Sequence, residues 1–286
     1  MKRLSVLMPA WNAGGTIAKS VESALADDPR IEVVVVDDAS TDNTREVVAM
    51  LQEQHPQRIV METLQRNGGP SVARNRALEL ASGDWVGLLD ADDLWLPGRL
   101  ARLEPRMEPS DVVSDALLVR EAGHAERIIP AAIPSTEVRS LDLVLLVRLD
   151  LGYLQPLMRR SFLQDNGIGW GTHRHSEDFL LAWKILRSGA RWSHVQIPGY
   201  VYIRTAASLT GQRRKGLEQG VSVLESLLAD FPEDPLVKKE LHRRIRIKSD
   251  LLALEDLRDL PGPRSFARAV PSFLRLALVR ILGARA

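Results

Sequence analysis

Short apolar runs alternate with helix-like segments over the first part of the chain. Four runs predict buried strands, and they span Leu4–Met8, Glu32–Val36, Ile59–Leu64 and Trp85–Leu89. The clearest is the run of four valines at 33–36, because continuous β-branched residues suit a strand that is covered on both faces.

Between these runs the apolar residues recur at helical spacing. The first such segment follows Thr16, a candidate cap, and carries Ile17, Val21, Ala24 and Leu25. The second follows two candidate caps, Asp42 and Thr44, and carries Val47, Val48 and Leu51. The third begins at Pro70 and ends at Gly83, with Val72, Ala73, Ala77, Leu78 and Ala81 on it. This alternation predicts βαβ units and a mostly parallel sheet.

The remaining pattern is mainly helical. We expect helices after Pro97, over Leu141–Arg148 and over Ser176–Ser188, whereas much of 97–165 is hard to assign. From about residue 215 the chain is helical and charged, without strand signals. A linker-like stretch at 211–216 divides the chain into an α/β domain, 1–212, and a helical extension, 213–286.

Composition narrows the class of protein. Of 286 residues, 45% are hydrophobic and 26% are charged, which is typical of a folded globular chain. There is no cysteine, so disulfides and thiolate metal sites are excluded. The net charge of +1 argues against a nucleic-acid partner. We find neither a secretory signal nor an apolar run of about 18 residues, and therefore expect a cytoplasmic protein.

Polar residues follow three of the four predicted strands. Pro9-Ala10-Trp11-Asn12 follows the first, Asp37-Asp38 follows the second, and Asp90-Ala91-Asp92-Asp93 follows the fourth. A single Asp in such a place is often a cap or turn residue, as we expect for Asp42. Three acids in four residues repel one another unless a cation or donor compensates them, and their oxygens suit Mg²⁺ or Mn²⁺.

These segments resemble the family 2 glycosyltransferases of the GT-A fold. The similarity rests on 5–12, 35–42, 69–75 and 88–93, which occur in the order and at the spacing of the family's motifs. It implies a Rossmann-like nucleotide half and an acceptor half on one continuous sheet, over about residues 4–210.

The resemblance also implies roles for the donor side. The backbone at Pro9, Ala10 and Trp11 would line the nucleotide pocket, and Asp38 would bind the base, usually uracil. Arg74 would face the diphosphate, although an Arg on a helix can also be merely solvated. Asp90 would lie near the ribose and Asp92 would bind the metal, while the role of Asp93 stays open.

On the acceptor side, inversion requires a carboxylate opposite the leaving diphosphate. The family places it in a Glu-Asp pair that opens a helix, which matches Glu177 and Asp178. Asp178 is therefore the expected base, with Glu177 near the acceptor; acids in a first helical turn also simply favour the helix dipole.

Three further residues are weaker candidates for contact with substrates. His173 and His175 precede the Glu-Asp pair and would bind acceptor or phosphate, unless they are solvated loop residues. Trp170 lies between glycines, and we expect it on a mobile loop, stacked on a sugar.

One position departs from the family pattern. Relatives carry Tyr-Arg-x-His-x-x-Ser-Leu after the last strand, and here Thr205 replaces the His, with Arg204 as a candidate substitute. The strength of metal dependence is therefore open.

The last segment, 261–286, has five Arg and no acid, so it carries +5 and the remainder about −4 (+1 − 5). Its apolar face holds Phe266, Val270, Phe273, Leu274, Ala277, Leu278 and Ile281. Such a segment suits peripheral contact with the inner face of an anionic membrane, or packing against the domain or a second subunit.

The sequence therefore predicts an inverting transferase. It would move a sugar from a nucleotide-diphosphate sugar, favouring UDP, to a saccharide or lipid-linked acceptor, in cell-surface polysaccharide or glycolipid synthesis. The main alternative is a non-catalytic module that binds nucleotide sugars. A haloacid-dehalogenase-type phosphohydrolase shares only the Asp90-x-Asp92 pattern, and no Gly-x-Gly-x-x-Gly supports a dinucleotide oxidoreductase.

Overall fold

The computed structural model describes residues 3–133, 138–171, 176–204, 213–230 and 233–258. Residue contacts divide the chain into two compact units, 1–208 and 209–286. The division falls close to the boundary expected at 212. Each unit is described here by itself.

The first unit begins with four parallel strands, all within two residues of the predicted bounds. They are β1 (Leu4–Ala10), β2 (Ile31–Asp37), β3 (Ile59–Thr63) and β4 (Trp85–Leu88). They lie side by side in the order β3-β2-β1-β4. Every residue of β2 is buried, as the run of valines predicts.

Three helices connect these strands: α1 (Ile17–Leu25), α2 (Thr44–Gln54) and α3 (Pro70–Leu80). Three details of the prediction are wrong. Thr16 stands at the cap position of α1 but makes no capping hydrogen bond from its side chain. Neither Asp42 nor Thr44 caps α2, because Asn43 stands at the cap position and Thr44 is already the first residue of the helix. The third helix ends at Leu80, before Gly83, because Ala81 already has extended backbone.

The second half of the unit continues the same sheet with strands that the sequence pattern did not predict. They are β5 (Leu94–Trp95), β6 (Val112–Glu121), β7 (Arg127–Ile129), β8 (Val138–Leu141), β9 (Leu157–Arg159) and β10 (Trp192–Arg204). Strand β9 runs antiparallel to both β4 and β6, and so joins the two halves. The sheet of the described residues follows β3-β2-β1-β4-β9-β6-β10-β5, with β7 on β6 and β8 on β10. It is mixed as a whole, and the expected parallel order holds over the first four strands and between β6 and β10.

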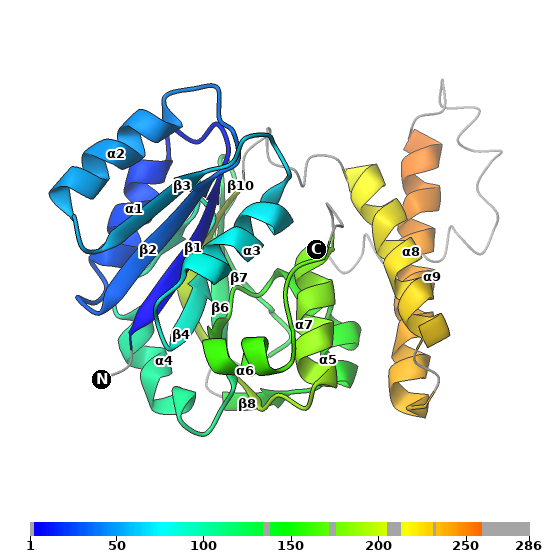
Figure 1. Ribbon diagram of the computed structural model, residues 1–286. Helices are drawn as coiled ribbons and strands as arrows, with labels where there is room; N and C mark the ends of the chain where they lie inside the picture. The colour runs from blue at the N-terminus through cyan, green and yellow to red at the C-terminus, as the bar shows by residue number, and fades with distance from the viewer. Residues whose placement is uncertain (1–2, 134–137, 172–175, 205–212, 231–232, 259–286) are drawn as a thin grey trace. The chain divides into compact units, whose positions relative to one another are not determined.

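Helices flank this sheet, as Figure 1 shows. The later ones are α4 (Arg99–Met107), α5 (Leu143–Leu149), α6 (Arg160–Asp165) and α7 (Glu177–Arg187), with a 3-10 turn at Leu151–Tyr153. Helices α4, α5 and α7 confirm the expected helices after Pro97, near 141–148 and at 176–188.

A buried ion pair fixes α4 to β6. Arg99 and Asp115 are both fully or nearly fully buried, and Arg99 Nη2 donates to Asp115 Oδ1 at 2.8 Å. The Arg99 guanidinium also stacks on Trp95 and Tyr200. Gly199 lets β10 approach this pair, because a Cβ there would lie 1.9 Å from Asp115 Oδ2.

The second unit contains α8 (Arg213–Asp230) and α9 (Pro235–Arg258), which pack side by side as a hairpin (Figure 1). Their buried residues include Val223, Leu224, Val237 and Leu241. The helical extension is thus confirmed up to residue 258, whereas the basic segment 261–286 lies outside the described residues. Within the described residues, no helix combines the length and the apolar run that a bilayer crossing needs.

Candidate active site

The loops that follow β1 and β2 are bound to each other. The backbone N–H of Asn12 donates to Ser40 Oγ at 2.9 Å, and Thr41 N–H donates to Asn12 Oδ1 at 2.8 Å. Ala10 is buried, Pro9 is half-buried, and Trp11 is 59% exposed. The expected nucleotide-pocket segment therefore presents an open aromatic ring on a fixed backbone.

Asp38 fixes the loop in front of α3. Its two carboxylate oxygens accept the backbone N–H groups of Gly68 and Gly69, each at 2.7 Å. Gly69 has φ +88°, which glycine adopts without strain. The Asp38 side chain is buried, and each oxygen keeps a further lone pair for a ligand. In this structure Asp38 positions the start of α3.

Arg74 lies one turn further along α3 and holds three carboxylates. Its Nη2 donates to Asp90 Oδ1 at 2.7 Å, and its Nη1 donates to Glu177 Oε1 and to Asp178 Oδ1, each at 3.2 Å. The Arg74 side chain is only 4% exposed. It is therefore neither a solvated helix-face residue nor open towards a diphosphate, because the carboxylates enclose its guanidinium.

This ion cluster joins residues that are far apart in the sequence. Asp90 follows β4 on the nucleotide side, whereas Asp178 opens α7, 104 positions after Arg74. About five residues of helix, or roughly 7.5 Å of rise, separate Arg74 from the glycines held by Asp38. Helix α3 thus connects the expected base-binding Asp38 to the expected catalytic Asp178.

Negative charge exceeds positive charge in this cluster. Burial and the charge of Asp178 raise the pKa of Glu177 to about 7, against the opposing effect of Arg74. Burial raises the pKa of Asp178 as well, and Arg74 opposes that shift. Burial lowers the pKa of Arg74, but the charges of Asp178, Asp90 and Glu177 outweigh this and raise it above its usual range. The guanidinium is permanently charged.

Asp93 is bound by groups that the sequence did not indicate. Tyr200 Oη donates to Asp93 Oδ2 at 2.7 Å, and the backbone N–H of Ile203 donates to Asp93 Oδ1 at 2.7 Å. Tyr200 Oη in turn accepts the backbone N–H of Asp90 at 3.2 Å. Burial and the charge of Asp90 raise the pKa of Asp93 to about 8. Strand β10 thereby holds the acidic loop in place, and nothing in the sequence distinguishes Tyr200 from any other strand tyrosine.

Asp92 is the acid of this loop that opens to solvent. Partial desolvation by the surrounding protein atoms, together with the charge of Asp90, raises its pKa. Among the described residues, no group of three or more His, Asp or Glu side chains is arranged to hold a metal. Hard oxygens with excess negative charge nevertheless fit a divalent cation, provided that a ligand or water supplies the remaining coordination.

Trp170 is not placed as expected. Its side chain is 5% exposed, and its indole Nε1–H donates to Asp178 Oδ1 at 3.1 Å. Asn75 binds the backbone of Trp170 on both sides, donating to its carbonyl and accepting its N–H, each at 2.9 Å. The indole therefore contacts the candidate base in place of a sugar. Sequence reasoning missed Asn75, although it directly follows Arg74.

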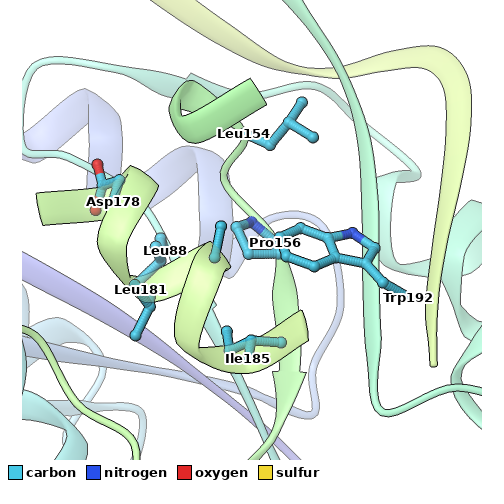
Figure 2. Close-up of a pocket in the computed structure, with 8 residues that line it drawn as sticks. Leu88, Leu154, Pro156, Asp178, Leu181, Ile185 and Trp192 are labelled. Atoms are coloured by element: carbon cyan, nitrogen blue, oxygen red, sulfur yellow. The ribbon is translucent and has the colours of Figure 1, made fainter. Parts of the chain in front are cut away.

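Helix α7 packs its apolar face over a small pocket, as Figure 2 shows. The pocket is lined by Leu88, Leu154, Pro156, Leu181, Ala182, Ile185 and Trp192, and Asp178 lies at one end of it. The apolar contact anchors the helix that carries the candidate base. The first turn of this helix carries Glu177 and Asp178, whose side chains are half-buried.

Strained backbone occurs beside the site residues. Among the described non-glycine residues, four have positive φ: Asn12, Ala39, Asp150 and Ser176. Asn12 directly follows Trp11, Ala39 directly follows Asp38, and Ser176 directly precedes Glu177. Such backbone is costly and concentrates at functional sites.

Some expected contacts cannot be placed. His173, His175 and Thr205 lie outside the described residues. Arg204, the suggested substitute for the missing His, donates to Glu121 Oε2 at 3.3 Å. In this structure Arg204, on β10, therefore forms an ion pair with Glu121 of the neighbouring strand β6.

Comparison with known proteins supports the resemblance. The sequence model described as Glycosyl transferase family 2 matches residues 5–144. Succinoglycan biosynthesis protein ExoU of Rhizobium meliloti (strain 1021) is 32% identical, over 92% of this chain and 80% of that protein. The Escherichia coli enzyme WfgD, a UDP-Glc:alpha-D-GlcNAc-diphosphoundecaprenol beta-1,3-glucosyltransferase, is 29% identical, over 82% of this chain and 88% of its own length.

Solved structures agree on the fold. S. aureus TarS 1–349 in complex with UDP superimposes with a TM-score of 0.66 at 22% identity, covering 97% of this chain and 78% of that one. From its motifs, its fold and the relatives that it matches over most of their length, the chain belongs to the family 2 glycosyltransferases.

Proposed function

We propose that this glycosyltransferase moves a sugar, with inversion, from a UDP-sugar to a hydroxyl of a saccharide or lipid-linked saccharide, in the synthesis of a surface polysaccharide. The observation that carries the proposal is the Arg74 cluster, in which donor-side Asp90 and acceptor-side Asp178 bind one buried guanidinium. Groups for both substrates are thereby within reach of one reaction centre.

The relatives support the choice of substrates. The name of WfgD specifies a UDP-glucose donor and a diphosphoundecaprenol-linked acceptor, and that of ExoU specifies succinoglycan biosynthesis. The exposed indole of Trp11 beside the fixed loop at 10–12 suits stacking on a nucleotide base. A lipid-linked acceptor would bring the protein to a membrane surface.

Asp178 performs the proton transfer in this proposal. Its Oδ1 accepts from Arg74 and Trp170, whereas its Oδ2 accepts no hydrogen bond from the described residues. The acceptor hydroxyl attacks the anomeric carbon, the bond between that carbon and the diphosphate oxygen breaks, and the hydroxyl proton moves to Oδ2. Attack opposite the leaving group inverts the anomeric centre.

Asp92 would hold a Mg²⁺ or Mn²⁺ ion together with phosphate oxygens of the donor. The bound cation would neutralise charge on the departing nucleoside diphosphate. Asp90 would lie near the ribose, and its pairing with Arg74 keeps its carboxylate fixed. Asp38 and the glycines that it binds would form the floor of the nucleotide site.

The deciding experiment compares Asp178→Asn with wild type. A panel of nucleotide sugars is first tested for thermal stabilisation with Mn²⁺, and the donor that binds is then used in transfer assays with lipid-linked acceptors. We expect Asp178→Asn to bind this donor while losing about 10³-fold or more in kcat. Asp165→Asn, an acid at the end of α6, serves as the control and should transfer normally.

Donor binding in wild type without transfer to any lipid-linked acceptor would contradict the proposed function. Full transfer activity in Asp178→Asn would show instead that another group accepts the proton.

A further inference from the structure

Two donors converge on a single oxygen of Asp178. Arg74 Nη1 and Trp170 Nε1 both donate to Oδ1, from α3 and from the segment before α7. Two bonds from different directions to one oxygen prevent rotation of the carboxylate, because turning it would break both at once. The other oxygen is left in a defined position.

The indole is held by a second pair of hydrogen bonds. Asn75 Nδ2 donates to the carbonyl of Trp170, and Asn75 Oδ1 accepts the backbone N–H of Trp170. Gly169 permits this approach, because a Cβ at 169 would lie 2.9 Å from Asn75 Oδ1. The side chain of one residue thus fixes both peptide groups that flank the indole-bearing residue.

We propose that Asn75 and Trp170 are positioning residues for the catalytic base, with Asn75 fixing Trp170 and Trp170 fixing Asp178. The inference rests on the proposed function, in which Asp178 is the base. Arg74 and Asn75 are neighbours on α3. Arg74 orients the base directly through an ion pair, and Asn75 orients it indirectly through the indole of Trp170. Trp170 is then not available to stack on a sugar.

The charged groups that face Asp178 come from three elements. They are Arg74 on α3, Asp90 after β4 and Glu177 on α7, and Trp170 supplies a neutral donor. The indole N–H stabilises the ionised carboxylate, so its removal raises the proton affinity of Asp178 further. A base that is more often protonated at low pH loses activity there first, and the acid limb of the rate profile moves to higher pH.

The first test is the pH dependence of kcat for Trp170→Phe, which keeps an aromatic ring but lacks the donor. We expect kcat at neutral pH to fall about 10- to 100-fold, the acid limb to move to higher pH, and KM for the donor to stay within about twofold. Trp85→Phe is the matched control, because this indole is equally buried but lies at the opposite end of β4 from Asp90, where Arg159 stacks on it. Its acid limb should coincide with that of wild type.

A second test does not depend on turnover. In ¹⁵N-labelled protein without metal or donor, the indole N–H signal that disappears in Trp170→Phe should shift downfield as Asp178 ionises. That shift should be absent in Asp178→Asn, and Asn75→Ala should weaken it without removing it. Because Asn75→Ala keeps the indole, it also tests the arrangement if Trp170→Phe does not fold.

The two proposals fail in different ways. The positioning role is overturned if the acid limb of the kcat profile does not move in Trp170→Phe, or if the indole N–H signal does not change as Asp178 ionises. Either result holds even where Asp178→Asn is inactive. An active Asp178→Asn overturns the base itself, whatever the indole signal does.

Discussion

Two groups of carboxylates lie near the expected reaction centre, and they are compensated in different ways. Asp90, Glu177 and Asp178 share the buried cation of Arg74. Asp92 and Asp93 contact no cation among the described residues, and Asp93 relies on the neutral donors Tyr200 and Ile203. The first group is therefore held by a cation of the protein itself, whereas no protein cation compensates the second among the described residues.

This difference separates two tasks of a glycosyl transfer site. A base must keep one orientation through every turnover, which a resident cation and a fixed indole provide. A metal site must accept and release its ion with the donor, which favours acids without a permanent counter-ion.

Removal of the resident cation should have the largest effect. Arg74→Gln leaves three half-buried carboxylates without their buried counter-ion, and breaking such a group costs about 3–5 kcal/mol of unfolding free energy. Urea unfolding at pH 7.5 measures this loss. Arg74→Lys should recover only part of it, because an ammonium cannot present the planar fork that reaches all three acids. If Arg74→Gln unfolds at the wild-type urea concentration, the cluster contributes nothing to the fold.

The second group should respond to added metal. Mn²⁺ at about 100 times its dissociation constant should raise the unfolding free energy by about 2.7 kcal/mol, measured with donor or nucleoside diphosphate present. Asp92→Asn should abolish most of the metal-dependent part while keeping the metal-free stability. An undiminished Mn²⁺ effect in this variant would place the ion elsewhere.

The sequence could predict the first half of the sheet, β1–β4, but little of the second half. Strands β1–β4 are continuous apolar runs whose pattern needs no knowledge of partners. Strand β6 contains Ser114 and Asp115, and β10 contains Pro198 and Gly199, where its pairing with β6 shifts register. Those polar and irregular residues are satisfied only by tertiary partners such as Arg99, so a local pattern could not reveal them.

The same limit applies to the site. Clustered acids after β4 and at the start of α7 were visible as motifs, and the structure brings Asp90 and Asp178 to one guanidinium. The sequence did not indicate which anionic groups Arg74 binds, because an arginine that binds protein carboxylates and one that binds a diphosphate look alike in sequence. Asn75 and Tyr200 act through contacts made across 95 and 110 positions of chain, for which a single sequence carries no signal.

The second group, through Asp93, should also make the free energy of unfolding depend on pH. Asp93 has a pKa of about 8 in the folded protein and an ordinary low value when unfolded, so the folded state binds one more proton between about pH 4 and pH 8. The contribution of Asp93 to the free energy of unfolding is therefore greatest below about pH 4. It falls as the pH rises towards 8, by about 1.4 kcal/mol per pH unit for one proton. Denaturant titrations in EDTA at pH 5.5, 6.5 and 7.5 measure the slope. Asp93→Asn should flatten it, and a slope equal to that of wild type would assign the proton to another group, such as Glu177.

The smallest effect should come from the contact that supports the indole. Gly169→Ala puts a methyl group 2.9 Å from Asn75 Oδ1, and the amide must move away from the Trp170 N–H to make room. Because Arg74 still holds Asp178, we expect kcat to fall only about two- to fivefold, with metal stabilisation unchanged. Gly15→Ala, where a Cβ meets no atom within 4 Å, controls for the general cost of replacing a loop glycine. If both variants turn over equally fast, the Asn75 contact is not needed to hold the base, and the direct ion pair with Arg74 suffices.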